Sequence, residues 1–357
     1  MIPAAQPIIG DDERAAVDAV LCSGGLAQGP KVAQFETEFA AIVAERPCVA
    51  VNSGTSALIL ALKAVGIRAG DEVIVPSFTF AATANAVVLA GATPVFADIT
   101  PDTFCLDPAA VRAAITPRTT AVLPVHLYGH PADMPALAEI ASRHNLAIIE
   151  DAAQAHEAAL SGTPVGAFGD AAAFSFYPTK NMTSGEGGMV VTCEDSAART
   201  VRLLRNQGME QRYRNEIVGY NMRMTDIHAA IGIVQLARLH AWNQRRRVIA
   251  AFYDRHLEGV TTPVVRDGAR HVYHQYTVMV ESDRDAFAAD LAQRGVGTGV
   301  YYPTPVHELP SFGLDLDLPV TRHCADHVLS WPVHPGLTDE DVATVVEAVN
   351  ATARAGA

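Results

Sequence analysis

Strand-like and helix-like segments alternate over the first two-thirds of this chain, and that order allows few folds. Four stretches begin with a short apolar run and continue into a helical pattern or a polar turn: 47–66, 71–91, 120–145 and 146–156. Such alternation predicts an α/β fold with a largely parallel sheet covered by helices on both faces. The stretch 170–193 differs, because a polar, glycine-rich turn joins two β-rich runs there without a helix.

The last third of the chain has another pattern. A long helical stretch at 225–257 precedes a β-rich run at 273–282, and amphipathic helical stretches follow at 283–295 and 338–356. This mixture predicts a smaller α+β unit. We place the boundary near Trp242–Arg247, which gives a large domain at 1–243 and a small C-terminal domain at 244–357.

The composition excludes several classes of function. The 357 residues carry 26 Lys and Arg against 39 Asp and Glu, a net charge of −13, whereas nucleic-acid binding normally leaves a basic footprint. The five cysteines are scattered without a CxxC pair, which is typical of a reduced cytoplasmic protein and offers no zinc pattern. No signal peptide or membrane-spanning run is recognisable. We therefore expect a cytoplasmic protein without nucleic-acid, membrane or metal-ion partners.

Small residues follow the first predicted strand. Asn52, Ser53, Gly54, Thr55 and Ser56 stand between the run CVAV and a helical pattern. Free N–H groups at a helix start attract a phosphate, and small side chains let it approach the backbone. The same residues are equally those of an ordinary capped turn, since Ser and Thr are favoured N-caps.

An acidic residue ends the strand-like run LAIIE. Asp151 could pair with a cationic ring nitrogen, or it could cap the next helix, as Asp often does. Gln154 and His156 follow closely, and each could be a hydrogen-bonded structural residue. Ligands of open α/β sheets gather beyond the carboxyl ends of the strands, where these residues are expected.

One lysine lies in an unusual context. Lys180 stands in the glycine-rich turn between the two β-rich runs, five residues after Ser175. Most lysines lie on solvated surfaces. Desolvation in such a turn would favour the neutral amine, which can attack an aldehyde and form a Schiff base. The hydroxyl of Ser175 would reach the same ligand.

These features fit one small molecule when they are taken together. Pyridoxal 5′-phosphate (PLP) needs an anion site, an acid opposite its pyridine nitrogen and an amine for its aldehyde. The Asn52–Ser56 turn, Asp151 and Lys180 supply these groups in order along the chain. An aromatic side chain such as Phe80 could stack on the ring. The sequence therefore predicts PLP as the cofactor.

The chain also resembles a known family. The segments VNSGTSALILAL, DEVIVPSFTFAATANAV, IIEDAAQAH, VGAFGDAAAFSFYPTKNMTSGEGGMV, GYNMRMTDIHAAIG and YYPTPVHELP are similar to those of the DegT/DnrJ/EryC1/StrS sugar aminotransferases. The likeness runs nearly end to end. It implies the PLP-dependent fold type I, with a mostly parallel seven-stranded sheet in the large domain.

The resemblance assigns roles to the matching positions. It implies that Lys180 binds the PLP aldehyde and shuttles the substrate proton, and that Asp151 pairs with the pyridinium. The other implied cofactor contacts are Gly54, Thr55 and Ser175 to the phosphate, Asn221 of the partner subunit to the same phosphate, Phe80 to the ring face and Gln154 beside the ring. Residues implied near the amino donor or the sugar are His307, Tyr302 and Glu186, of which Glu186 could equally be structural.

The implied reaction is amino transfer from glutamate or glutamine to a nucleotide-linked ketosugar, in amino-sugar, secondary-metabolite or polysaccharide biosynthesis. A dTDP-4-keto-6-deoxyhexose stands first, a 3-keto sugar second and a keto-cyclitol third, and the implied assembly is a homodimer with shared active sites. Some members that carry His at the lysine position are dehydratases, so Lys180 favours transamination. A PLP-binding regulator without turnover is the alternative. A nicotinamide dehydrogenase is disfavoured because no GxGxxG follows the first strand.

One position departs from the family pattern. Glu157 stands after AQAH, where the family usually has glycine. A glutamate is accommodated there without strain only if its φ is negative. The departure concerns local geometry and leaves the expected cofactor unchanged.

Overall fold

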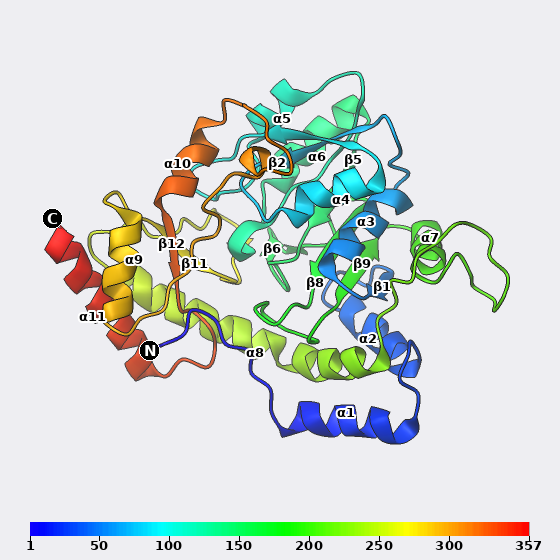
Figure 1. Ribbon diagram of the computed structural model, residues 1–357, viewed down its shortest axis with the longest axis horizontal. Helices are drawn as coiled ribbons and strands as arrows, with labels where there is room; N and C mark the ends of the chain where they lie inside the picture. The colour runs from blue at the N-terminus through cyan, green and yellow to red at the C-terminus, as the bar shows by residue number, and fades with distance from the viewer. Residues whose placement is uncertain (357) are drawn as a thin grey trace.

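A seven-stranded sheet forms the centre of the computed structural model, which describes residues 1–356 (Figure 1). Its strands, in spatial order, are β1 (Cys48–Val51), β9 (Gly188–Thr192), β8 (Ala171–Ser175), β5 (Ala147–Asp151), β4 (Thr119–Val122), β2 (Glu72–Pro76) and β3 (Thr93–Ala97). Only β9 runs antiparallel to its neighbours. Because the turn between β8 and β9 contains no helix, the chain reverses directly into the neighbouring strand. The expected mostly parallel seven-stranded sheet is confirmed.

Helices cover both faces of this sheet. One face carries α3 (Gly54–Ala64), α4 (Ala82–Ala90) and α7 (Asp195–Arg205), and the other carries α2 (Pro30–Ala40), α5 (Pro108–Ala114), α6 (Met134–His144) and part of α8 (Asp226–His256). Along β2, Val73 and Val75 pack on the α3 side whereas Ile74 packs on the α6 side. This two-residue alternation with apolar residues on both sides is what a doubly covered strand requires. Helix α1 (Asp11–Ser23) packs outside, on α8.

The C-terminal part has its own core. β11 (Tyr276–Met279) pairs antiparallel with β12 (Val328–Trp331), and α9 (Arg284–Gln293) and α11 (Asp339–Gly356) complete an α+β unit, whereas α10 (Pro319–His327) packs on the α6 side of the large sheet. Tyr276, Trp331 and Val345 lie in one apolar cluster there. Helix α8 continues without a break across the expected boundary at 243/244 and joins the two parts (Figure 1). The division into two domains stays a prediction.

Short elements complete the chain. β10 (Ala269–Arg270), β6 (Ala159–Leu160) and β7 (Thr163–Pro164) form a small sheet, and η1 (Leu127–Gly129) and η2 (Val306–Glu308) are single 3₁₀ turns. Within residues 1–356, none of the helices combines the length and apolar character needed to span a bilayer.

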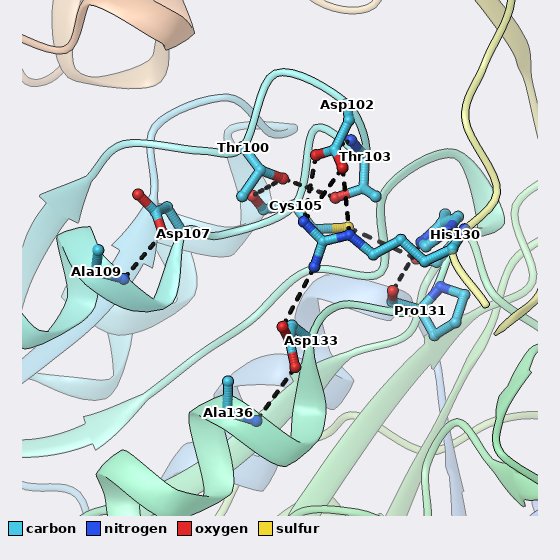
Figure 2. A network of polar contacts seen from close by, with 11 residues as sticks. Thr100, Asp102, Thr103, Cys105, Asp107, Ala109, His130, Pro131, Asp133 and Ala136 are labelled. Atoms are coloured by element: carbon cyan, nitrogen blue, oxygen red, sulfur yellow. Dashed lines mark hydrogen bonds and ion pairs between the residues drawn. The ribbon is translucent and has the colours of Figure 1, made fainter. Parts of the chain in front are cut away.

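Asp102, His130 and Asp133 lie close together (Figure 2), and Arg266 from the segment after α8 contacts all three. Arg266 donates to both oxygens of Asp102 at 3.3 Å and to Asp133 Oδ2 at 3.2 Å, and its backbone N–H donates to His130 Nε2 at 3.2 Å. These ion pairs are about one-third exposed, so each one alone adds little stability. Together they hold residues 263–275 against the loop that contains Gly129, where a Cβ would lie 2.8 Å from Val272 Cγ2.

Candidate active site

Asp151 is buried at the carboxyl end of the central strand β5. Thr83 Oγ1 donates to its Oδ2 at 2.8 Å, and the Ala153 N–H donates to its Oδ1 at 3.1 Å. Burial raises the pKa of this carboxyl, while the two hydrogen bonds and the Lys180 amine oppose the rise. Turns follow at 152–157 rather than a helix, so Asp151 is not a helix N-cap.

Lys180 lies in the turn that connects β8 to β9. Burial lowers the pKa of its amine to about 8, and the carboxylate of Asp151 opposes this fall. A substantial fraction of the amine is therefore neutral near physiological pH, and the neutral amine is the form that attacks an aldehyde. The fold brings this amine and this acid, which are 29 residues apart in sequence, within electrostatic reach of each other.

The lowered pKa gives a testable pH dependence. In the cofactor-free protein, acylation of Lys180 by an amine reagent should rise with pH through a midpoint near 8, as followed by peptide mass analysis, with the Lys31 and Lys63 peptides as recovery references. Because the Asp151 carboxylate favours the ammonium form, Asp151→Asn should move the midpoint to lower pH. A midpoint near the ordinary lysine value of 10.5 would contradict the desolvated environment.

A small-residue cradle lies at the start of α3, at the same edge of the sheet as Asp151. Ser53 Oγ accepts the Ser56 N–H at 3.1 Å, so the turn is capped as its sequence suggests. The N–H groups of Gly54 and Thr55 belong to the first helical turn and have no partner within the helix. A Cβ on Gly54 would lie only 2.7 Å from the Cβ of Ser175, so these two residues are in direct contact. Backbone N–H groups and the Ser175 hydroxyl thus converge where a phosphate would fit.

A glycine of the GEGG motif lets this cradle form. Gly188 begins β9 between β1 and β8, and a Cβ there would lie 2.4 Å from the Ser53 carbonyl oxygen. A larger residue would displace the turn that leads into α3. Close packing therefore requires glycine at the last position of the motif, whereas the side chain of Glu186 is exposed.

Aromatic and amide side chains line the other side of the site. Gln154 Oε1 accepts the Tyr128 N–H at 2.7 Å, and Gln154 Nε2 donates to Tyr302 Oη at 3.0 Å. The ring of Tyr302 lies 5.9 Å from that of Phe80, which is 58% exposed just beyond β2. Burial raises the pKa of the Tyr302 phenol, and Asp151 adds to the rise. Phe80, Gln154 and Tyr302 therefore form a continuous wall next to Asp151.

Amide side chains from α8 hold the Lys180 turn. Asn181 Nδ2 donates to Asn243 Oδ1 at 2.8 Å and to the Val272 carbonyl at 2.9 Å, and its Oδ1 lies 3.2 Å from His274 Nδ1. Further along the turn, the Thr183 N–H donates to Gln235 Oε1 at 3.3 Å. The sequence analysis does not identify these residues, because the helical pattern of α8 does not show which of its polar side chains face inward.

The structure shows the backbone geometry at Glu157, where the chain departs from the family pattern. Its φ is +68°, in the left-handed region that favours glycine, so the condition for a glutamate without strain is not met. Such a conformation costs a non-glycine residue roughly 1 kcal/mol. Contacts with α8 offset this cost, since the carboxylate accepts hydrogen bonds from Asn243 Nδ2 at 3.1 Å and pairs with His240 Nδ1 at 2.6 Å.

Among the described residues, three with predicted roles make no hydrogen bond or ion pair with Asp151 or Lys180. His307 is buried, and its Nδ1 lies 2.6 Å from Ser77 Oγ, a contact that joins η2 to the residue after β2, while its Nε2 lies 3.5 Å from Glu308 within η2. The side chain of Asn221 is exposed. The backbone carbonyl of its neighbour Met222 accepts the Asn52 N–H at 3.0 Å, so this segment lies beside the start of α3. The roles predicted for His307, Asn221 and Glu186 stay predictions, as do those of the other site residues.

The geometry defines a class of protein: an α/β fold that brings a buried strand-end acid, a lysine of lowered pKa and a small-residue helix start to one edge of its sheet. Comparisons with known proteins specify it further. The sequence model of the DegT/DnrJ/EryC1/StrS aminotransferase family matches residues 7–350. The chain belongs to this family, as the resemblance indicates.

Relatives and solved structures agree with this membership. The dTDP-3-amino-3,4,6-trideoxy-α-D-glucose transaminase of Streptomyces venezuelae is 46% identical, over 94% of this chain and 90% of its own. The crystal structure of S. venezuelae DesV in complex with a ketimine intermediate is 45% identical, with a TM-score of 0.93 over 96% of this chain and 94% of that chain. The PLP form of a putative sugar aminotransferase, Spr1654 of Streptococcus pneumoniae, is 28% identical, with a TM-score of 0.95 over 100% and 99%.

The protein is therefore a sugar aminotransferase of a family that acts on nucleotide sugars with PLP as cofactor. The predictions of fold type I, of an aminotransferase and of PLP are confirmed.

Proposed function

We propose that this enzyme transfers an amino group from glutamate or glutamine to a dTDP-linked keto-6-deoxyhexose in the cytoplasm. The observation that carries the proposal is the convergence of the Lys180 amine, the buried Asp151 carboxylate and the Gly54–Ser175 cradle at one edge of the sheet. PLP supplies an aldehyde and a protonated ring that withdraws electrons from the substrate. The placement in the cytoplasm is supported by five free, scattered cysteines.

Each part of the site has a task in this proposal. Lys180 Nζ binds the cofactor between turnovers and moves the proton to and from the reacting carbon. Asp151 keeps a proton on the ring nitrogen, because a carboxylate beside that nitrogen favours its charged form. The first turn of α3 and Ser175 hold the phosphate. Phe80 and Gln154 orient the ring from the side of Tyr302.

The position of the new amino group divides the candidate substrates. Family resemblance places a 4-keto sugar first, a 3-keto sugar second and a keto-cyclitol third. The 46% identical transaminase of S. venezuelae is named for a product with its amino group at C3 and no oxygen at C4. This name supports the 3-keto sugar, so we propose a dTDP-3-keto-6-deoxyhexose as substrate and retain the 4-keto isomer as the second candidate.

A panel of acceptors tests the proposal. The PLP-loaded enzyme is incubated with glutamate or glutamine carrying ¹⁵N in the α-amino group and, separately, with dTDP-3-keto, dTDP-4-keto and UDP-linked ketosugars and a keto-cyclitol. We expect ¹⁵N in the dTDP-3-amino sugar, with slower transfer to the others. Label only in a 4-amino sugar would assign the second candidate. Label in no acceptor, with PLP bound, would favour a non-catalytic regulator.

We also propose a homodimer with active sites shared between subunits, as the family resemblance implies. Large apolar side chains are exposed just beyond β2 and β8, at Phe80 and Tyr177, and in the loop between α7 and α8, at Tyr213 and Val218. Clusters of exposed apolar side chains commonly mark protein interfaces. In this assembly Asn221 of one subunit would bind the PLP phosphate held by the other.

Mixing two inactive variants tests the shared site. Asn221→Asp sets a negative charge against the phosphate and should weaken PLP binding, while Lys180→Ala removes the reacting amine. If Asn221 acts across the interface, a mixed dimer has one site with both defects and one intact site, so activity returns towards half of that of the wild-type enzyme per mixed dimer. If it acts within its own chain, every site keeps one defect. No recovery after demonstrated subunit exchange would therefore refute the shared arrangement.

A further inference from the structure

Two buried threonines lead to the carboxylate of Asp151. Thr83 lies in the first turn of α4 and is fully buried, and Thr79 precedes the helix with 3% of its surface exposed. Thr83 Oγ1 donates to Asp151 Oδ2 at 2.8 Å, and the two threonine hydroxyl oxygens lie 3.0 Å apart. Neither residue has a task in the function proposed above.

The direction of these hydrogen bonds follows from the chemistry of the groups. An ionised carboxylate only accepts hydrogen bonds, and a hydroxyl has one proton to donate. Since the proton of Thr83 goes to Asp151, Thr83 must accept the proton of Thr79. The two hydroxyls therefore form a relay that ends on Oδ2, and the hydrogen bond from Thr83 is strongest while Asp151 is ionised.

Few charged groups surround Asp151, so the hydrogen bond from Thr83 matters for its ionisation. The titratable groups that face the carboxyl are Lys180 from the turn after β8, His126 from the segment after β4 and Tyr302 from the loop before η2. Helix α4 contributes only the Thr83 hydroxyl, because its sequence ATANAVVLA has no titratable side chain. Burial raises the pKa of Asp151, and the Thr83 hydrogen bond is the foremost contribution against that rise.

We propose that Thr83, oriented by Thr79, is a positioning residue that keeps Asp151 ionised and thereby able to hold a proton on the pyridine nitrogen. This inference rests on the role given to Asp151 in the proposed function. It predicts that loss of one hydroxyl, without any change in charge, weakens the acid that faces the cofactor ring.

Direct titration of Asp151 tests the inference without reference to turnover. The full-length, cofactor-free protein is labelled with ¹³C at the aspartate carboxyl carbons, and the Asp151 signal is identified by its loss in Asp151→Asn. In Thr83→Val, which keeps the shape of the side chain, the midpoint should lie about 1 pH unit or more above the wild-type midpoint, because a hydrogen bond to the charged form is lost. Thr83→Ser should restore it, and Thr79→Val should cause a smaller rise.

Activity provides the second readout. In Thr83→Val the acid limb of the kcat profile should move to higher pH by a similar amount, with the KM for glutamate little changed, and Thr83→Ser should again recover. Thr83→Ala serves in place of Thr83→Val if the valine variant does not fold. Equal midpoints in the wild type and the hydroxyl-free variant would overturn the inference even if the enzyme transaminates sugars. A shifted midpoint in a chain without transaminase activity would support the relay and overturn the proposed function.

Discussion

Lys180→Ala is expected to lower turnover by about 10³-fold or more, because it removes both the nucleophile for the cofactor aldehyde and the proton carrier. The cradle formed by the start of α3 and Ser175 is untouched, so the variant should still bind PLP, with weaker affinity. Its unfolding midpoint should stay close to that of the wild type, since the lost amine is partly buried and disfavoured by desolvation. Turnover with glutamate and the preferred ketosugar, together with PLP binding by equilibrium dialysis, measures the effect.

The chain offers matched controls for this variant. It contains only three lysines, and Lys31 and Lys63 donate to Gln34 Oε1 at 3.1 Å and to the Ala90 carbonyl at 3.2 Å. Lys31→Ala and Lys63→Ala should keep near-normal turnover. If Lys180→Ala also kept it, the catalytic assignment would be wrong.

Asp151→Asn is expected to lower turnover by roughly 10- to 150-fold through the lost charge-assisted hydrogen bond alone, and further through the less protonated ring. The fold should tolerate it. Asparagine can donate to Thr83 Oγ1 and accept from the Ala153 N–H, while the Thr83 hydroxyl turns to donate elsewhere. Because the native pKa of Asp151 is raised, its ionisation opposes folding as pH rises through that pKa, so the neutral variant should be as stable at pH 7 or more stable.

The neighbouring carboxylate on β5, that of Glu150, is expected to affect stability rather than turnover. Glu150 is buried and accepts N–H groups from Gly166, Phe168 and Gly169 and a contact from His126 Nε2 at 3.0 Å. Although burial raises its pKa, these partners outweigh burial and the net pKa is lowered. Its ionised form therefore stabilises the fold, and this contribution is lost as pH falls. Glu150→Gln should lower the unfolding midpoint, whereas Asp151→Asn should mainly lower turnover. Near-normal turnover in Asp151→Asn would mean that Asp151 is structural.

The sequence contains enough information to predict which strand ends meet. Alternating strands and helices imply parallel strands whose carboxyl ends share one edge, and Gly54, Asp151 and Ser175 each follow or end such a strand. The reversal at β9 could also be anticipated, because the residues between the two β-rich runs have no helical pattern that could cross between parallel strands. These rules depend on local pattern and chain connectivity, which a single sequence displays.

Contacts between distant side chains could not be predicted in the same way. In the sequence, Thr83 is one residue of the helical pattern after SFTF, and nothing there links it to Asp151. Its hydroxyl reaches Asp151 because α4 packs with its first turn near the end of β5. Asn243 meets Asn181 across 62 positions, through a helix whose polar residues lie on all sides. The positive φ of Glu157 depends on partners on that same helix. Such contacts require the relative placement of whole elements, which periodicity does not give.

The central claim is that Lys180 is the residue that binds PLP covalently, and borohydride trapping tests it most directly. The purified full-length protein is loaded with PLP, reduced with sodium borohydride and digested, and the pyridoxyl group is located by peptide mass analysis. With three lysines and one N-terminal amine, few sites compete for the label. The account predicts a pyridoxyl group on the Lys180 peptide alone, lost in Lys180→Ala. Label on Lys31, on Lys63 or on the N-terminus instead, or on no peptide of a PLP-containing sample, would contradict it.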